Sequence, residues 1–116
     1  MNSKKIFTEE EFKDEVLHSR KPVLVEYAST WSGACHIMRP VINNLIKEYN
    51  GRIKFCLIDC DKENSIAKFY GVLQLPTFQF FLHGQVIEHI YGALSRKELS
   101  ENLNLLLEKL EKTNRQ

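Results

Sequence analysis

The chain has 116 residues, of which 43% are hydrophobic and 27% charged, a balance typical of one soluble domain with a single core. The formal net charge of +1 provides no field that would gather nucleic acid or anionic lipid, so we expect neither partner. The first ten residues contain no apolar run long enough for a signal peptide or a membrane span, and the three cysteines have no disulfide-framework spacing. We therefore expect a cytoplasmic monomer.

Strand and helix patterns alternate in the first half of the chain. A short edge strand is predicted over residues 4–7, followed by a helix from Thr8 to about His18 that opens with the capping box Thr8-Glu9-Glu10-Glu11. Val23–Ala28 is nearly continuous in apolar residues, as in a strand covered on both faces, and a longer amphipathic helix is predicted over Gly33–Tyr49. This order indicates right-handed crossovers and parallel strands.

The second half adds a strand over residues 53–60, a helix over 61–70, and a hairpin of strands 77–82 and 86–91. A second capping box, Ser95-Arg96-Lys97-Glu98, opens a final helix with leucines on one face, and the polar tail 112–116 is expected to fray. The whole pattern predicts one α/β domain over residues 1–116, ordered over about 4–111, with a mixed sheet of four or five strands flanked by four helices.

Chemistry is expected where the strand over residues 23–28 passes into the next helix. Cys35 lies in the first helical turn, where unpaired backbone N–H groups and the helix dipole favour a thiolate. Such a thiol could form mixed disulfides, or it could be an inert, buried side chain. Ser32, three residues earlier, is interpreted as the helix N-cap. A hydrolase with His36 as base would lack an orienting acid and an oxyanion site.

Three further side chains are candidates for a role at this site or in the core. Glu26 lies in the apolar strand, where burial should raise the pKa of its carboxyl, so it either tunes Cys35 or is a structural acid bonded to water. Cys56 and Cys60 are about 13 Å apart along one strand, too far to form a disulfide with each other. Both are expected in the core, with Cys60 as a possible second thiol for Cys35. We expect no cofactor and no metal site.

Five pieces of the chain, in the correct order, resemble the thioredoxin family over about Phe7 to Leu110. They are Val23-Leu24-Val25-Glu26-Tyr27, the turn Trp31-x-Gly33-x-Cys35, Pro40, Leu75-Pro76-Thr77, and Tyr91-Gly92-Ala93. The resemblance implies the thioredoxin fold, with Pro76 cis and facing the cysteine motif. It also implies a groove for an extended protein segment, walled by Trp31, Gly33, Ala34, Leu75, Pro76, Gly92 and Ala93.

The sequence departs from the family at positions that carry its chemistry. Ser32 stands where thioredoxins have the attacking cysteine, while Cys35 matches the resolving thiol. In the family the acid at the position of Glu26 relays a proton to that thiol. Leu57 stands where a lysine often pairs with this acid, so we expect no ammonium to offset the burial of Glu26. Ala34 replaces the usual proline, and Ala28 a common second tryptophan.

Two functional interpretations follow from the resemblance. In the first, the chain is a member of the thiol–disulfide oxidoreductases that cannot run dithiol reduction, because of Ser32, and exchanges thiols through Cys35 at most. In the second, it is a redox-silent module that binds a partner segment beside Pro76. Its enzymatic status stays open, because Ser32 could be an engineered replacement or native to a degenerate member. A protein substrate and a thioredoxin reductase are the implied partners.

Overall fold

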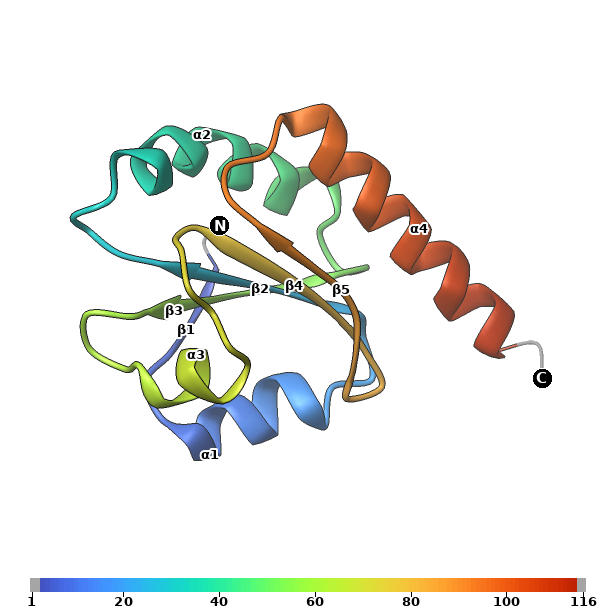
Figure 1. Ribbon diagram of the computed structural model, residues 1–116. Helices are drawn as coiled ribbons and strands as arrows, with labels where there is room; N and C mark the ends of the chain where they lie inside the picture. Colours follow the sequence, from blue (N-terminus) through green and yellow to red (C-terminus); the bar gives the residue numbers. More distant parts are fainter. Residues whose placement is uncertain (1–2, 115–116) are drawn as a thin grey trace.

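A computed structural model describes residues 3–114 as a five-stranded mixed sheet with helices on both faces, as predicted (Figure 1). The strand order is β1-β3-β2-β4-β5. β1 (Lys4–Ile6), β3 (Lys54–Asp59) and β2 (Val23–Ala28) run parallel, whereas β4 (Thr77–Leu82) and β5 (Gln85–Tyr91) are antiparallel additions. The chain is therefore a single-domain α/β fold of the predicted kind.

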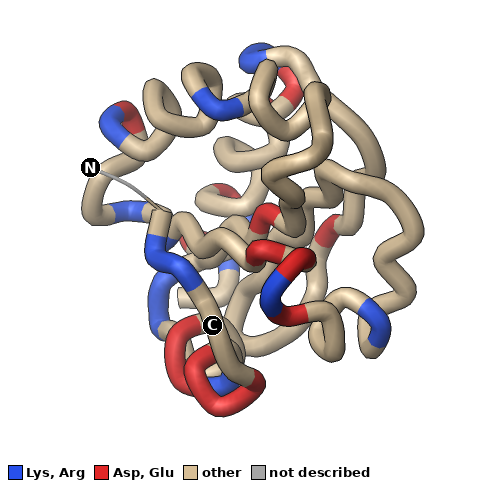
Figure 2. Tube along the Cα trace, turned by 90° about the vertical axis from the view of Figure 1, so that its left-hand side faces the viewer, with Lys and Arg blue, Asp and Glu red and all other residues tan. Residues whose placement is uncertain are grey.

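Four helical units cover the sheet. α1 (Glu9–Phe12) continues as a π-helical segment η1 (Lys13–Leu17) and lies with α3 (Ser65–Phe69) on one face, while α2 (Gly33–Glu48) and α4 (Arg96–Asn114) lie on the other (Figure 1). Acidic residues gather along α1, at the bottom of Figure 2. No helix within residues 3–114 is both long and apolar enough to cross a membrane.

Two helices differ in length from their predictions. α3 begins at Ser65 rather than Asp61, because the Glu63 carboxylate accepts hydrogen bonds from the backbone N–H groups of Ser65 and Ile66 at 2.6 and 3.1 Å and fixes a turn before the helix. α4 continues to Asn114, so residues 112–114, expected to fray, are helical. Residues 115–116 of that tail lie outside the described residues. The predicted capping box is present, with reciprocal Ser95–Glu98 hydrogen bonds of 3.1 and 3.3 Å.

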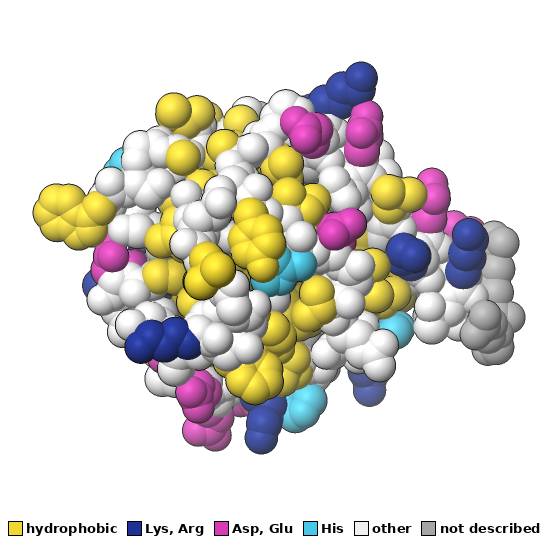
Figure 3. All heavy atoms as spheres, in the orientation of Figure 1, with side chains coloured by type: hydrophobic (Ala, Val, Ile, Leu, Met, Phe, Trp, Pro, Cys, Tyr) yellow, Lys and Arg dark blue, Asp and Glu magenta, His cyan; other side chains and the backbone are white. Residues whose placement is uncertain are grey.

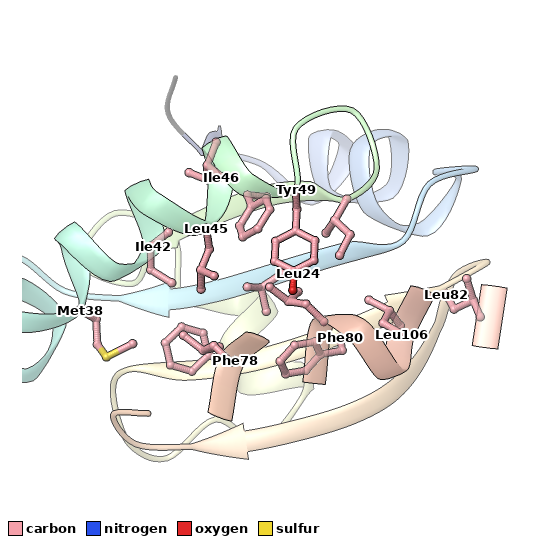
Figure 4. Close-up of a cluster of buried hydrophobic side chains, with 14 residues drawn as sticks. Leu24, Met38, Ile42, Leu45, Ile46, Tyr49, Phe78, Phe80, Leu82 and Leu106 are labelled. Atoms are coloured by element: carbon pink, nitrogen blue, oxygen red, sulfur yellow. The ribbon is translucent and has the colours of Figure 1, made fainter. Parts of the chain in front are cut away.

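The core above the sheet explains why α2 has a fixed position. All six residues of β2 are buried, as the apolar run predicts. Leu24, Phe78 and Phe80 project from the sheet toward the buried faces of α2 and α4 (Figure 4). The helical residues of this cluster recur at the predicted amphipathic spacing and include Met38, Ile42, Leu45, Leu99, Leu103 and Leu106. This packing holds the first turn of α2 at the carboxyl end of β2.

Candidate functional site

Ser32 caps the helix that carries Cys35. Its backbone is extended, with φ −92° and ψ 117°, and its Oγ accepts a hydrogen bond from the Cys35 backbone N–H at 3.2 Å. The N-cap prediction is therefore confirmed. Cys35 lies directly inside the helix and is only 3% exposed. The Ser32 oxygen thus accepts a hydrogen bond from the Cys35 N–H. The same N–H would favour a thiolate if a cysteine stood at position 32.

The arrangement does not support a serine hydrolase. His36 Nε2 lies 2.7 Å from the Thr30 carbonyl oxygen, and since that oxygen only accepts, this nitrogen carries the hydrogen. Within residues 3–114, Ser32 Oγ has no hydrogen bond to an imidazole or carboxylate. None of the described residues therefore activates the hydroxyl as a nucleophile.

Asp61 holds the loop between β2 and α2, a role that sequence reasoning missed. Its carboxylate accepts hydrogen bonds from Ser29 Oγ at 2.9 Å, from Thr30 N at 3.2 Å and from Thr30 Oγ1 at 3.1 Å. Ser29 Oγ in turn accepts from the Trp31 N–H at 3.1 Å. The loop is thereby fixed with the Trp31 side chain 89% exposed. The sequence did contain a signal for this role, because Asp61 follows the strand that runs parallel to β2. Parallel strands end at the same edge of the sheet, so an acid there lies near the end of β2.

The segments of the predicted groove meet at the same end of the sheet. Tyr27 pairs with Thr77, and Thr77 pairs with Tyr91, so the chain leaving β2, entering β4 and leaving β5 comes together there. The Gly92 N–H donates to the Pro76 carbonyl at 2.8 Å, and the Leu75–Pro76 peptide bond is cis. Of the seven groove residues only Pro76 is buried. The other six retain exposed surface: Trp31, Gly33, Ala34, Leu75, Gly92 and Ala93.

Large apolar side chains are exposed on the segments that form this end of the molecule. Besides Trp31, they include Ile37 (74% exposed), Leu73 (92%) and Tyr91 (49%). Figure 3 shows hydrophobic side chains spread over the face on which β5 lies. Apolar surface of this kind, next to a strand end, is suited to binding protein.

Glu26 has a cationic partner, which corrects the expectation that nothing offsets its burial. Arg39, one turn along α2 from Cys35, places Nη1 3.4 Å from Oε1 and donates a 3.4 Å hydrogen bond from Nη2 to Oε2. The sequence expectation failed because it looked for a lysine at position 57, whereas the cation comes from the helix above. Burial still raises the pKa of the Glu26 carboxyl, with Arg39 acting in the opposite direction. The contact of Glu26 with α2 is thus made at Arg39, one turn beyond Cys35.

The two remaining cysteines pack below the sheet, in or against the cluster that contains Tyr27. Burial raises the pKa of the Cys56 thiol to about 12, and burial together with the neighbouring Asp59 raises that of Cys60 to about 11. Both are therefore thiols rather than thiolates near neutral pH. All three cysteines are free.

Comparison with known proteins supplies the family context. The thioredoxin family model matches residues 3–105. Thioredoxin 1 of Nostoc sp. is 35% identical over 96 residues, which cover 83% of this chain and 90% of that protein. Thioredoxin M5, chloroplastic, of rice is 39% identical over 92 residues, covering 79% of this chain and 54% of its own length. Thioredoxin Y1, chloroplastic, of Arabidopsis thaliana is 38% identical over 96 residues, covering 83% of this chain and 56% of that protein.

Proposed function

Because the chain belongs to the thioredoxin family of redox proteins, we propose that it is a thiol–disulfide oxidoreductase scaffold that Ser32 prevents from running dithiol disulfide reduction. The observation that supports this proposal is the position of Ser32 Oγ. It caps α2 at the place where the resemblance puts the attacking sulfur, 3.2 Å from the amide of Cys35. A serine hydroxyl without an adjacent base is a weak nucleophile, and it cannot pair with Cys35 as the dithiol that gives up two electrons on forming a disulfide.

Monothiol exchange through Cys35 is the redox chemistry left to this scaffold. In that step the Cys35 thiolate attacks a partner disulfide, a mixed disulfide forms, and the second partner sulfur leaves as a thiolate. Release then requires another thiol from the partner or from solution. Because Cys35 is only 3% exposed, this reaction requires a partner disulfide that can reach a largely buried sulfur. Glu26 is the proposed proton-tuning residue for this thiol.

Cys60 is a weak candidate for the missing second thiol. Its pKa, raised to about 11, leaves little thiolate near neutral pH, and its Sγ lies 3.9 Å from the Ile58 carbonyl oxygen as a hydrogen-bond donor. Thiol mapping after oxidation tests the idea, since a surrogate role requires a Cys35–Cys60 link.

A redox-silent binding function is the second candidate, and the exposed apolar side chains at this end of the sheet favour it. An extended partner segment would pair with backbone beside Pro76 and place its side chains against the exposed Trp31 and the half-buried Leu75. The proposed partners are a protein substrate or ligand and, for a redox role, a thioredoxin reductase. A cytoplasmic location and a monomeric state are parts of the same proposal.

Insulin disulfide reduction by this chain and by its Ser32→Cys variant separates the candidates. The proposal expects no turnover by the chain and turnover by the variant, because the Cys35 amide and helix dipole would then stabilise an attacking thiolate. The double change Ser32→Cys, Cys35→Ser is the matched control and should form mixed disulfides without turnover. Turnover by the unaltered chain would refute the proposal, whereas an inactive variant would favour the binding function.

A further inference from the structure

A cavity of about 430 Å³ opens on the α2 face of the sheet, away from the groove beside Pro76. Lys5, Leu57 and Glu26 form one row across β1, β3 and β2 and point to this face. The buried side of α2 packs over β2, β4, α4 and Phe55 of β3, whereas at the outer end of the row Leu57 is half-buried and Lys5 is exposed. Leu57 lines the resulting cavity, and none of the seven groove residues does.

The lining of this cavity is cationic in a chain of almost neutral charge. Lys5, Arg39 and Lys62 line it together with a single carboxylate, that of Asp59. Within residues 3–114 the ammonium groups of Lys5 and Lys62 have no ion pair or hydrogen bond, while an Asp59 oxygen accepts from the Asp61 N–H at 2.9 Å. The acidic residues of α1 lie on the other face of the sheet. The cavity is thus suited to an anion.

Arg39 provides the most specific contact at the inner wall. Its guanidinium has five N–H donors in a planar fork, and within residues 3–114 only Nη2 makes a hydrogen bond, to Glu26 at 3.4 Å. Both Nη atoms face the Glu26 carboxylate, and the N–H groups that do not point at Glu26 are available to a second oxyanion. Since Arg39 is about one-third exposed and lines the cavity, a ligand can reach it from solvent.

Part of the remaining lining is apolar, beside polar residues such as Thr30 and Asn43, and this part indicates a ligand with a hydrophobic portion. Phe7 is 50% exposed, Leu57 is half-buried, and the Ala28 methyl group completes this wall. The volume lies within the range of small-molecule sites, roughly 300–1,000 Å³. We propose that this cavity binds a small organic carboxylate, with its carboxylate on Arg39 and the two lysines and its apolar part against Phe7, Ala28 and Leu57. The ligand would lie against Cys35, which lines the same cavity.

Phenylacetate is a suitable probe, and amide NMR spectra of the full chain detect where it binds. The proposal expects saturable shifts at Cys35, Arg39, Leu57 and Lys62, with phenylacetamide, which lacks the charge, binding about 10-fold more weakly. Inorganic phosphate, which lacks the apolar part, should also bind more weakly. Equal binding of acid and amide, phosphate binding as tight as phenylacetate, shifts confined to the Pro76 groove, or no saturation would each overturn it.

Variants test the assignment of residues. Lys5→Gln and Lys62→Gln should each weaken phenylacetate about 2- to 5-fold, as expected for exposed charges, while Lys97→Gln on α4 should have no effect. Asn43→Trp fills the cavity and should abolish binding, whereas Asn44→Trp, next to it on α2 but outside the lining, should retain it. Unchanged affinity in both lysine variants would refute the proposal even if a tryptophan variant fails to fold.

Discussion

The Arg39–Glu26 pair predicts a pH-dependent loss of stability when Arg39 is replaced by methionine. Both oxygen–nitrogen contacts are 3.4 Å, and Glu26 is 2% exposed. At an effective dielectric constant of about 20 the Coulomb attraction is about 5 kcal/mol. Desolvation of the carboxylate opposes it, and water around the one-third-exposed guanidinium screens it. We therefore expect Arg39→Met to lower the free energy of unfolding by about 1–2 kcal/mol at pH 7.5.

The sign of the pH dependence follows from the protonation of Glu26. Burial raises the pKa of this carboxyl in the folded chain above its ordinary value of 4.5, so the folded state binds more protons and stability falls as pH rises above that value. Removing Arg39 raises the pKa of Glu26 further and steepens this fall. Below pH 4.5 the carboxyl is protonated in both states, and the cost of Arg39→Met should shrink to lost packing.

Urea unfolding at pH 4 and pH 7.5 measures the effect, with Glu26→Gln as the matched background. In the Glu26→Gln background Arg39→Met should lower the free energy of unfolding little at either pH, because residue 26 then carries no charge for Arg39 to compensate. Glu26→Gln alone should gain stability over the parent chain as pH rises. An equal cost of Arg39→Met at both pH values, or in both backgrounds, would show that the ion pair does not compensate the burial of Glu26.

Three further changes test the packing that positions the site. Leu103→Ala removes a fully buried side chain and should cost about 2–4 kcal/mol in urea unfolding, whereas a loss below 1 kcal/mol would mean that α4 repacks. Gly84→Ala should lower the melting temperature, because φ is +80° and the new Cβ would lie 2.7 Å from the Leu17 carbonyl oxygen; an unchanged melting temperature would contradict this geometry. Ser95→Ala removes the cap that bonds Glu98 and should cost about 1 kcal/mol, and an unaltered unfolding midpoint would count against it.

Strong local patterns made the fold predictable from sequence. The apolar run Val23–Ala28 has the bounds of β2, and the hairpin turn at His83-Gly84 adopts the positive φ values that a two-residue turn needs. The Ser32 cap was equally predictable, because it depends on four successive residues, 32–35. The end of α4 was not predictable. Its last turn, residues 111–114, is polar and carries no apolar spacing that would mark it as helical.

The parts of the site that escaped prediction all depend on contacts between distant segments. Arg39 reaches Glu26 from the helix above the strand, and Asp61 reaches Thr30 across the ends of two parallel strands. Neither contact follows from one segment alone, because the first depends on how α2 packs and the second on the register of β2 with β3. The cavity at Leu57 likewise results from where α2 does not cover the sheet.

Counting thiols by intact mass after equilibration with oxidised dithiothreitol tests most directly whether oxygen at position 32 abolishes the dithiol couple. The account predicts that this chain keeps three free thiols, as in the structure, and that its Ser32→Cys variant loses two hydrogens to an internal disulfide with Cys35. An internal disulfide in the unaltered chain would contradict the account, because a second thiol would then already serve Cys35.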